Sequence, residues 1–310
     1  MDSNSFDSLN PRLPKDMVDI SYDNYKLDKI IEKTKIKIQP NKTIKELRDD
    51  QSIQNEYSIL QNITDYDENH IQKLSKDSKK NRYTDIRTYE YNKVPLESKE
   101  YINASFIDIP NKKYFISTQG PIESTINDFW EMIFEYDCKI ILMLCNEIEG
   151  GRKKCAEYWK AKKISYQIEY KEDIKQNLII RDIQITKDNV SKNVIQIQYK
   201  GWPDHGIPKI EEAYESFLFM IQYIITTNSN SPVVCHCSAG VGRTGTFLTL
   251  FNLYVEIERK KNDPEIQFNI FNVVRKLKEM RMLLVQTDTQ YWFIYKYIET
   301  YLKKLFKKKI

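Results

Sequence analysis

A chain of 310 residues fits one large domain or two small ones, and its 41% hydrophobic and 30% charged residues suit a soluble, well-packed fold. The net charge of +4 is mild and no basic patch is interleaved with aromatic residues, which argues against nucleic acid as a partner. Five cysteines in so long a chain do not indicate a disulfide framework, and neither they nor the three histidines have metal-ligand spacing, so we expect no metal and no other cofactor.

The ends of the chain indicate where the protein works. Residues 1–16 are polar and show no signal-peptide pattern, and no apolar run reaches the roughly 18–20 residues that span a bilayer. We therefore expect no transmembrane segment and a reducing cytoplasmic location, with the nucleus as the alternative. The lysine-rich segment 303–310 could act as a weak membrane-surface anchor or a nuclear signal, but a solvated helix end is the simpler interpretation.

Three units are predicted along the chain. Residues 1–42 have no convincing hydrophobic period and several prolines, which predicts a loosely ordered extension with at most a short helix over 27–34. Residues 43–302 carry the periodic segments of one domain, and 303–310 form the basic tail. Nothing in the sequence indicates association, so we expect a monomer.

The first half of the domain mixes helices and strands. Helical spacing of apolar residues predicts a helix over 43–62, and the polar stretch 64–79 is typical of a surface loop. Alternating patterns predict strands over 101–107 and 113–118. A helix follows, with Ser124 or Thr125 as its N-cap.

The middle of the domain is expected to be a sheet. A continuous apolar run over 139–145 indicates a buried strand, and residues 149–152 form a turn. Three consecutive alternating segments then predict an antiparallel meander, with Asp188-Asn189 as one of its turns. These segments cover residues 163–170, 177–186 and 193–200.

Helices dominate the last third. We predict helices over 209–226, from the end of the 233–245 segment to 262, and over 266–280, and a final helix that begins with a capping box at Thr287. Strands in the middle with helices around them predict an α/β (α+β) fold: a single domain with a central twisted mixed sheet flanked by helices.

One segment carries the strongest chemical signal. Residues 233–245, VVCHCSAGVGRTG, form a short β-branched run, a glycine-containing loop and the start of a helix. Such a loop is an anion site, because its backbone N–H groups and the helix dipole favour negative charge. Cys237 opens the loop and Arg243 closes it. A thiol facing this site ionises more readily than a free cysteine, and an arginine can fork onto two phosphate oxygens. We predict a nucleophilic thiolate in an oxyanion cradle.

A thiolate that displaces an oxygen from phosphorus needs a general acid for the leaving oxygen. Asp204 is the candidate, because it lies in the turn-rich segment GWPDHG at 201–206, which combines a rigid proline with flexible glycines. By itself this segment is an ordinary surface turn. Its significance depends on the cysteine loop.

Taken together, these segments resemble the classical, phosphotyrosine-specific, non-receptor protein tyrosine phosphatases. The loop HCSAGVGRTG resembles the family's signature loop, and WPD resembles its mobile acid loop. The resemblance covers about residues 50–302 in the family's own order. Further landmarks are KNRY at 80–83, YINASFI at 101–107, STQGP at 117–121, DFWEMI at 128–133, KCAEYW at 154–159 and QTDTQY at 286–291.

The resemblance implies roles for the reacting groups. Cys237 would be the nucleophile, Asp204 the acid of the first step and the base of the second, and Gln286 the residue that positions the hydrolytic water. It also implies phosphotyrosine-containing proteins as the substrates. Arg243 and the loop residues would hold the phosphoryl oxygens; these are Ser238, Ala239, Gly240, Val241 and Gly242.

The same resemblance implies substrate-binding and supporting residues. Tyr83 would set the cleft depth, Asp85 would hold main-chain amides of the substrate, and Lys154 would approach the acid loop and the phosphate. The supporting residues are His236 beside the thiolate, Thr244 as a donor to the Cys237 sulfur, Glu149 as the partner of Arg243, and Trp202 and Gln290 in the two flanking loops.

Some positions depart from the family's pattern. Thr84 stands where some members carry a basic residue, which weakens an expectation of acidic substrates. Lys278 and Leu283 stand where some members have an arginine and a glycine that open a second phosphate pocket, so we expect no preference for doubly phosphorylated peptides. Cys235 is expected to be a buried strand residue; the alternative is a resolving thiol for oxidised Cys237, in competition with a sulfenamide at Ser238.

Two other functions stay open at this point. A phosphotyrosine-binding protein without activity would be expected to lack the nucleophile, the acid or the arginine, and Cys237, Asp204 and Arg243 are all present. A dual-specificity or inositide phosphatase would use the same loop, but without a motif like residues 80–83, and inositide-directed loops tend to carry lysine where this loop has Ala239 to Val241.

Overall fold

A mixed sheet of seven strands forms the centre of the protein in the computed structural model, which describes residues 50–66, 74–75, 79–109, 113–162, 165–175, 177–227, 230–261 and 269–307. The strand order is β1-β2-β9-β3-β8-β7-β6. The four inner strands β2, β9, β3 and β8 run parallel, and the pairs at both ends of the sheet are antiparallel. The strands are β1 (Ala104–Ile109), β2 (Lys113–Thr118), β3 (Ile140–Met143), β6 (Gln167–Lys175), β7 (Leu178–Lys187), β8 (Val190–Tyr199) and β9 (Val233–His236).

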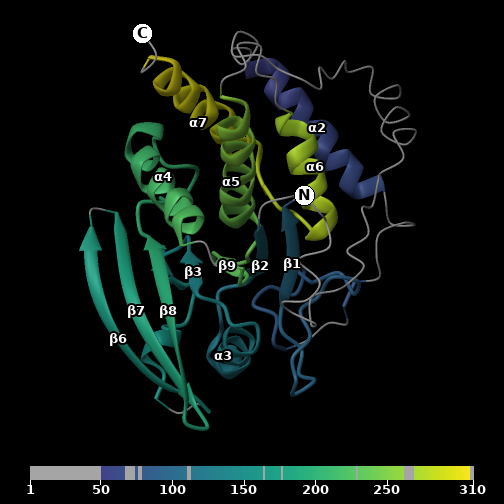
Figure 1. Ribbon diagram of the computed structural model, residues 1–310. Coiled ribbons are helices and arrows are strands. Elements are labelled where there is room, and N and C mark those ends of the chain that lie inside the picture. Colours follow the sequence, from purple (N-terminus) through teal and green to yellow (C-terminus); the bar gives the residue numbers. More distant parts are fainter. Residues whose placement is uncertain are drawn as a thin grey trace, which may run out of the picture.

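Helices cover both faces of the sheet. Figure 1 shows α2 and α4 to α7 gathered on one side and α3 on the other, so the predicted mixed sheet flanked by helices is confirmed. Helix α5 packs against β9 and forms the centre of the larger helical layer. The helices are α2 (Asp50–Tyr66), α3 (Ile126–Glu135), α4 (Ile210–Thr226), α5 (Gly242–Lys260), α6 (Ile270–Met280) and α7 (Asp288–Lys307), with 3-10 turns at Glu123–Thr125 and Tyr158–Lys160.

The position of β9 explains the placement of the cysteine loop. All four β9 residues are buried, between β2 on one side and β3 on the other. A parallel strand buried on both faces needs the short apolar run that Val233 and Val234 begin. The loop that follows β9 therefore emerges at the carboxyl edge of the parallel strands, where ligands bind in open α/β sheets.

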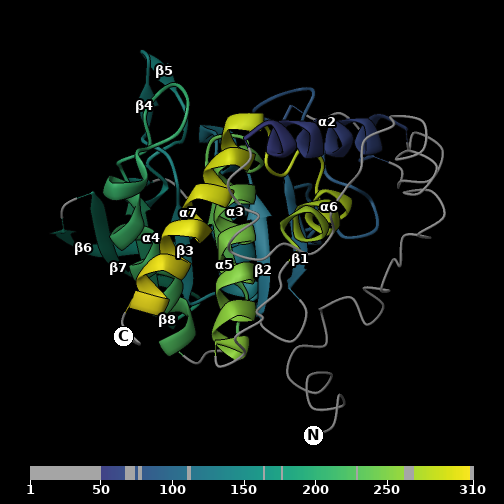
Figure 2. The same cartoon turned by 90° about the horizontal axis from the view of Figure 1, so that it is seen from above.

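The predicted antiparallel meander is present as β6, β7 and β8. Strand β7 lies within one residue of the predicted 177–186, whereas β6 ends five residues after 170 and β8 begins three residues before 193. Asp188 and Asn189, with φ of 50° and 63°, form the two-residue turn between β7 and β8. Residues 149–152, predicted as a turn, belong to a second small sheet, the hairpin β4 (Ile148–Glu149) and β5 (Arg152–Lys153). Gly150 and Gly151 make its turn with positive φ, and Figure 2 shows the hairpin projecting at one end of the molecule.

Other boundaries differ from the prediction where tertiary contacts decide them. The first strand is Ala104–Ile109 and not 101–107, because it pairs residue by residue with β2. The first helix continues to Tyr66, into the predicted loop. The predictions for residues 1–42 and for the start of the helices at 43 and 266 lie outside the described residues.

One glycine is required where two parts of the site meet. A Cβ on Gly245 in α5 would lie 2.3 Å from the backbone N of Val285 and 2.9 Å from the carbonyl carbon of Leu284. The backbone of the segment before α7 thus packs directly on the first turn of α5. Both segments carry predicted site residues, so this contact fixes their relative position.

Gly245→Ala should therefore destabilise the protein by about 1–3 kcal/mol through collision, although alanine favours helices. Gly151→Ala is the control, because nothing lies within 4 Å of its Cβ position and only its φ of 71° opposes the change. We expect the control to cost about 1 kcal/mol. Urea unfolding of both variants measures this, and a Gly245→Ala protein as stable as the parent would contradict the packing account.

Candidate active site

A pocket of about 380 Å³ brings together residues from most of the predicted segments. The loop after β9, the segment after β8, the β4–β5 hairpin and the segment before α7 all contribute to its wall. The predicted residues that line it are Tyr83, Asp85, Glu149, Lys154, Trp202, Asp204, Cys237, Ser238, Ala239, Gly242, Arg243, Gln286 and Gln290. The other four, His236, Gly240, Val241 and Thr244, are buried around the loop.

The carbonyl groups of the cysteine loop, from Ser238 to Val241, are all held from outside the pocket. The Ser238 carbonyl accepts from the Gly120 N–H at 2.9 Å, and the Val241 carbonyl accepts from the N–H groups of Gly245 and Val285. Between them, the carbonyls of Ala239 and Gly240 accept from one guanidinium, that of Arg281, at 3.1 and 2.9 Å. Ser117 Oγ also donates to the Gly240 carbonyl. Because a trans peptide points its N–H away from its C=O, this arrangement turns N–H groups of the loop inward.

Arg281 is a functional residue that the sequence analysis missed. It is fully buried, and burial lowers its pKa to about 10, which still leaves it charged at neutral pH. Besides the two loop carbonyls it donates to Asn103 Oδ1 and Ser105 Oγ in the β1 region. It directly follows α6 and belongs to no motif that the sequence displays, so only the fold reveals its role.

A carboxylate fixes the direction of Arg243. Its Nη1 and Nη2 donate to the two oxygens of Glu149 at 2.5 and 2.8 Å, and the Glu149 side chain is 2% exposed. Burial lowers the pKa of Arg243, but the hydrogen bonds and charge of Glu149 outweigh this and raise it overall. The guanidinium is therefore always charged, and the fork with Glu149 leaves it little rotational freedom.

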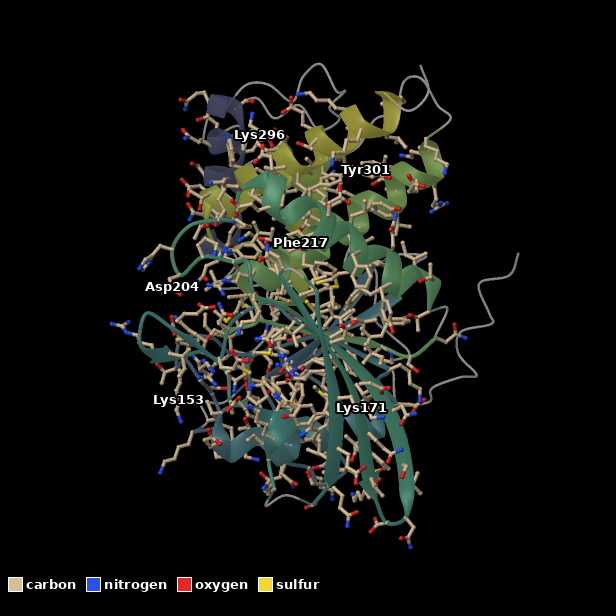
Figure 3. The ribbon with its side chains drawn as sticks, turned by 90° about the vertical axis from the view of Figure 1, so that its left-hand side faces the viewer. Lys153, Lys171, Asp204, Phe217, Lys296 and Tyr301 are labelled. Carbon is tan, nitrogen blue, oxygen red and sulfur yellow. The ribbon has the colours of Figure 1, made fainter. Side chains whose placement is uncertain are left out.

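The acid segment lies against this arginine. The Pro203 carbonyl accepts a hydrogen bond from Arg243 Nη2 at 3.4 Å, and the Trp202 ring lies 5.6 Å from the Arg243 guanidinium carbon. Trp202 is buried and donates to the Gly206 carbonyl at 3.1 Å, which closes the turn around Asp204. Asp204 itself is exposed at the edge of the molecule, and Figure 3 shows it there. It lines the same pocket as Cys237.

The Tyr83 hydroxyl connects the mouth of the pocket to its floor. Ser238 Oγ donates to the Lys154 carbonyl at 3.0 Å, so the contact of 2.9 Å between Tyr83 and Ser238 has Tyr83 as its donor. The neighbouring Arg82, for which the sequence suggested no role, donates to the carbonyls of Gly120, Pro121 and Lys153. It thereby fixes Tyr83 against the segment that also anchors the cysteine loop.

His236 is a neutral hydrogen-bond donor. Its Nδ1 lies 3.1 Å from the Cys237 carbonyl, which can only accept, so Nδ1 carries the proton and Nε2 accepts from the Tyr158 hydroxyl at 2.9 Å. Burial lowers the pKa of His236 to about 4. Gln196 donates to the same Tyr158 oxygen, and Arg181 donates to Gln196. This buried chain is invisible in the sequence.

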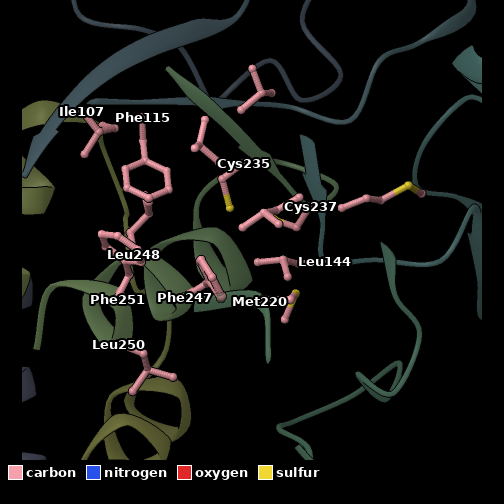
Figure 4. Packing of buried hydrophobic residues seen from close by; sticks show 14 of the residues in the cluster. Ile107, Phe115, Leu144, Met220, Cys235, Cys237, Phe247, Leu248, Leu250 and Phe251 are labelled. Atoms are coloured by element: carbon pink, nitrogen blue, oxygen red, sulfur yellow. The ribbon is translucent and has the colours of Figure 1, made fainter. Parts of the chain in front are cut away.

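Two other predicted contacts have a different geometry. The Thr244 hydroxyl is buried beside the Cys235 thiol and has no ordinary hydrogen-bond partner among the described residues, so the expected bond to the Cys237 sulfur is not formed. Cys235 lies among core side chains (Figure 4). Burial raises the pKa of its thiol, and the charge of a neighbouring Cys237 thiolate raises it further.

The capping box before α7 is only half formed. Thr287 Oγ1 accepts from the Gln290 N–H at 3.2 Å, but the Gln290 side chain accepts from the Gln286 N–H at 2.9 Å and not from Thr287. Gln290 is buried and Gln286 is exposed. The cap therefore ties the backbone of Gln286 to α7 while its side chain stays at the pocket.

Two positions at which the chain departs from the family's pattern lie away from the pocket wall. Lys278 is buried and donates to the Val285 carbonyl, and neither it nor Leu283 lines the pocket. Across the described ranges, no three of the His, Cys, Asp and Glu side chains gather as a metal site would require, and no helix is long and apolar enough to cross a bilayer.

Comparisons with known proteins show which family this chain resembles. The family model described as protein-tyrosine phosphatase matches residues 77–300. A curated relative from Rattus norvegicus, tyrosine-protein phosphatase non-receptor type 20, is 38% identical over 240 residues, which are 73% of this chain and 55% of the relative. The type 20 protein of Homo sapiens is 40% identical over the same shares. The chain thus spans about half the length of these relatives.

A solved structure has the same fold. The catalytic domain of human protein tyrosine phosphatase non-receptor type 18 superposes with a TM-score of 0.72 at 31% identity, over 80% of this chain and 95% of that one. Another structure of that relative, with the same TM-score and identity, contains phosphopeptides of HER2.

The neutral state of His236 predicts a pH dependence of stability. Its pKa of about 4 in the folded protein lies below the ordinary value of 6.5, so the unfolded chain binds the proton more readily. This contribution is complete above about pH 6.5 and disappears as the pH falls toward 4. The parent should lose about 3 kcal/mol more than His236→Asn between pH 7 and pH 4 in urea unfolding. Equal losses would show that burial does not suppress this titration.

Proposed function

Since the chain belongs to the protein-tyrosine phosphatase family, we propose that it hydrolyses phosphotyrosine in proteins through a cysteinyl-phosphate intermediate. The observation that carries this proposal is the joint placement of Cys237, the Arg243–Glu149 fork and Asp204 around one pocket. Because the carbonyls of the cysteine loop bond to donors outside the pocket, the N–H groups of the same peptides point into it. Together these groups suit an anionic, tetrahedral or trigonal phosphoryl group.

In the first step, the Cys237 thiolate attacks phosphorus in line with the tyrosine oxygen. The S–P bond forms as the P–O bond breaks, and Asp204 gives its proton to the departing phenolate oxygen. The equatorial oxygens accept hydrogen bonds from the loop N–H groups and from the Arg243 guanidinium, which Glu149 holds in position. His236, donating to the Cys237 carbonyl, positions the backbone next to the nucleophile and does not transfer protons.

In the second step, water attacks phosphorus on the side that the tyrosine has left. Asp204, now a carboxylate, accepts one proton of the water, the S–P bond breaks, and the thiolate and inorganic phosphate are released. Gln286 at the pocket positions this water. The substrate-side roles of Tyr83 as a wall, Asp85 as an acceptor for peptide N–H groups and Lys154 near the phosphate belong to the same proposal.

The proposal extends to the setting of the enzyme. Residues 43–302 would be the catalytic domain, acting as a monomer in the cytoplasm on phosphotyrosine-containing proteins that take part in signalling. The phosphopeptides bound by the type 18 relative support this substrate class. Lys303 and Lys304 lie in the last turns of α7 and pair with Glu299 and Glu215, which fits a solvated helix end.

An acid at Asp204 predicts a particular dependence on the leaving group. Asp204→Asn should lower kcat on phenyl phosphate by about 10²–10⁴-fold, because the poor leaving group then departs unprotonated. On p-nitrophenyl phosphate, which leaves readily as an anion, the loss should be much smaller. Asp182→Asn, an exposed aspartate on β7, is the matched control and should behave as the parent, and Cys237→Ser should abolish turnover.

Equal losses of Asp204→Asn on both substrates would contradict its role as the acid. Absence of turnover in the parent, with phosphotyrosine peptides still bound, would instead favour a binding protein without activity.

The depth of the pocket predicts selectivity. Tyr83, whose hydroxyl is hydrogen-bonded to Ser238 on the floor, forms one wall of the pocket. A phenyl phosphate is long enough to bring its phosphorus past this wall to the floor, and a serine phosphate is too short. We expect a preference of at least about 10²-fold in kcat/KM, roughly 3 kcal/mol, for a phosphotyrosine peptide over its phosphoserine counterpart. Tyr83→Ala should reduce the ratio. Equal rates for both peptides in the parent would point to a dual-specificity phosphatase.

A further inference from the structure

Val285, directly before Gln286, has a backbone conformation that its side chain disfavours. Its φ is 58°, in the left-handed region, although valine is β-branched and here fully buried. Such a conformation persists only where the surrounding structure holds it. The contacts that hold Val285 therefore control the direction in which the chain enters Gln286.

Three hydrogen bonds hold this residue in place. The Val285 N–H donates to the Val241 carbonyl of the cysteine loop at 3.2 Å. The Val285 carbonyl accepts from the Tyr57 hydroxyl at 3.1 Å and from Lys278 Nζ at 3.2 Å. One residue thus joins the cysteine loop, α6 and the N-terminal helix α2.

Tyr57 is itself rigidly placed on α2. It is 3% exposed, and its ring lies 5.7 Å from that of Tyr291 on α7. The adjacent Glu56 accepts hydrogen bonds from the hydroxyls of Tyr291 and Tyr295. Figure 2 shows α2 lying across the layer formed by α6 and α7. Helix α2 ends before residue 77, where the match to the family model begins.

The geometry transmits any movement of Val285 to the pocket. The Val285 carbonyl and the Gln286 N–H belong to the same peptide group, and that N–H donates to the buried side chain of Gln290 at 2.9 Å. A rotation of this peptide group would displace the N–H from Gln290 and turn the Gln286 side chain. Its amide would then no longer point to the place where water must attack.

We propose that Tyr57 is a positioning residue for the second chemical step: its hydroxyl holds the Val285 peptide in the left-handed conformation and thereby aims Gln286 at the attacking water. The inference rests on the proposed function. It assigns to α2 a part in hydrolysis of the cysteinyl-phosphate and none in its formation. The Val285 N–H that bonds to the cysteine loop belongs to the preceding peptide group, whereas Tyr57 bonds to the Val285 carbonyl. Among the described residues, that carbonyl accepts from Tyr57 and Lys278 and not from Cys237, Arg243 or Asp204.

The test compares Tyr57→Phe with Tyr297→Phe. Both remove one buried tyrosine hydroxyl that donates to a backbone carbonyl at 3.1 Å, but Tyr297 donates to Tyr214, on α4. The substrate is p-nitrophenyl phosphate. Nitrophenol release in a single turnover measures formation of the intermediate, and the later release of phosphate measures its hydrolysis, both by rapid mixing.

For Tyr57→Phe we expect nitrophenol release within about two-fold of the parent and phosphate release slowed about five-fold, the equivalent of one hydrogen bond. Tyr297→Phe should leave both rates unchanged. Unchanged phosphate release in Tyr57→Phe, or parallel slowing of both steps, would overturn the inference. A parent protein that releases neither product would instead refute the proposed function, so the two failures are distinguishable.

Discussion

The outward fixation of four successive carbonyls, from Ser238 to Val241, is the constraint on which the site depends. An anion cradle is useful only if its N–H groups already point inward before the ligand arrives, since reorienting them during the reaction would consume the stabilisation they provide. Here the donors that fix the carbonyls come from separate parts of the chain: the Gly120 N–H, Arg281, Ser117 and the segment before α7. The loop is short, so the rest of the domain determines its shape.

The two arginines of the site, Arg243 and Arg281, differ in whether a carboxylate balances their charge. Arg243 has Glu149 as a forked partner, whereas the groups to which Arg281 donates are neutral oxygens. Removing a buried partner leaves an uncompensated charge, which costs more than the pair itself contributes. The Glu149 carboxylate is therefore as necessary to the site as the arginine it holds. A thiolate or a bound phosphoryl group near the loop meets a positive environment that the protein has already organised.

Much of the site could be predicted from the sequence, because its reacting groups lie in short segments whose residue types carry the chemistry. Cys237 and Arg243 share one loop, and Asp204 follows a proline in a turn. The groups that hold them could not be predicted. Arg281 bonds to Gly240, 41 residues away in the chain, and Tyr57 bonds to Val285, 228 residues away. The local pattern of a sequence does not predict contacts over such separations. The strands of the seven-stranded sheet were located correctly, and 113–118 matches β2 at both ends. Most other strand ends were not predicted, since pairing with the neighbouring strands sets where each one stops.

The central claim is that Cys237 carries the phosphoryl group between the two steps. The most direct measurement is to mix the protein with p-nitrophenyl phosphate, quench within milliseconds in acid, and locate the phosphate by mass spectrometry of the digested chain. We predict a gain of one phosphoryl group on the peptide that contains Cys237, absent from Cys237→Ser and removed when the native protein is given time to complete the turnover. Phosphate release by the parent with no phosphorylated intermediate, or with the phosphate on another residue, would contradict the account.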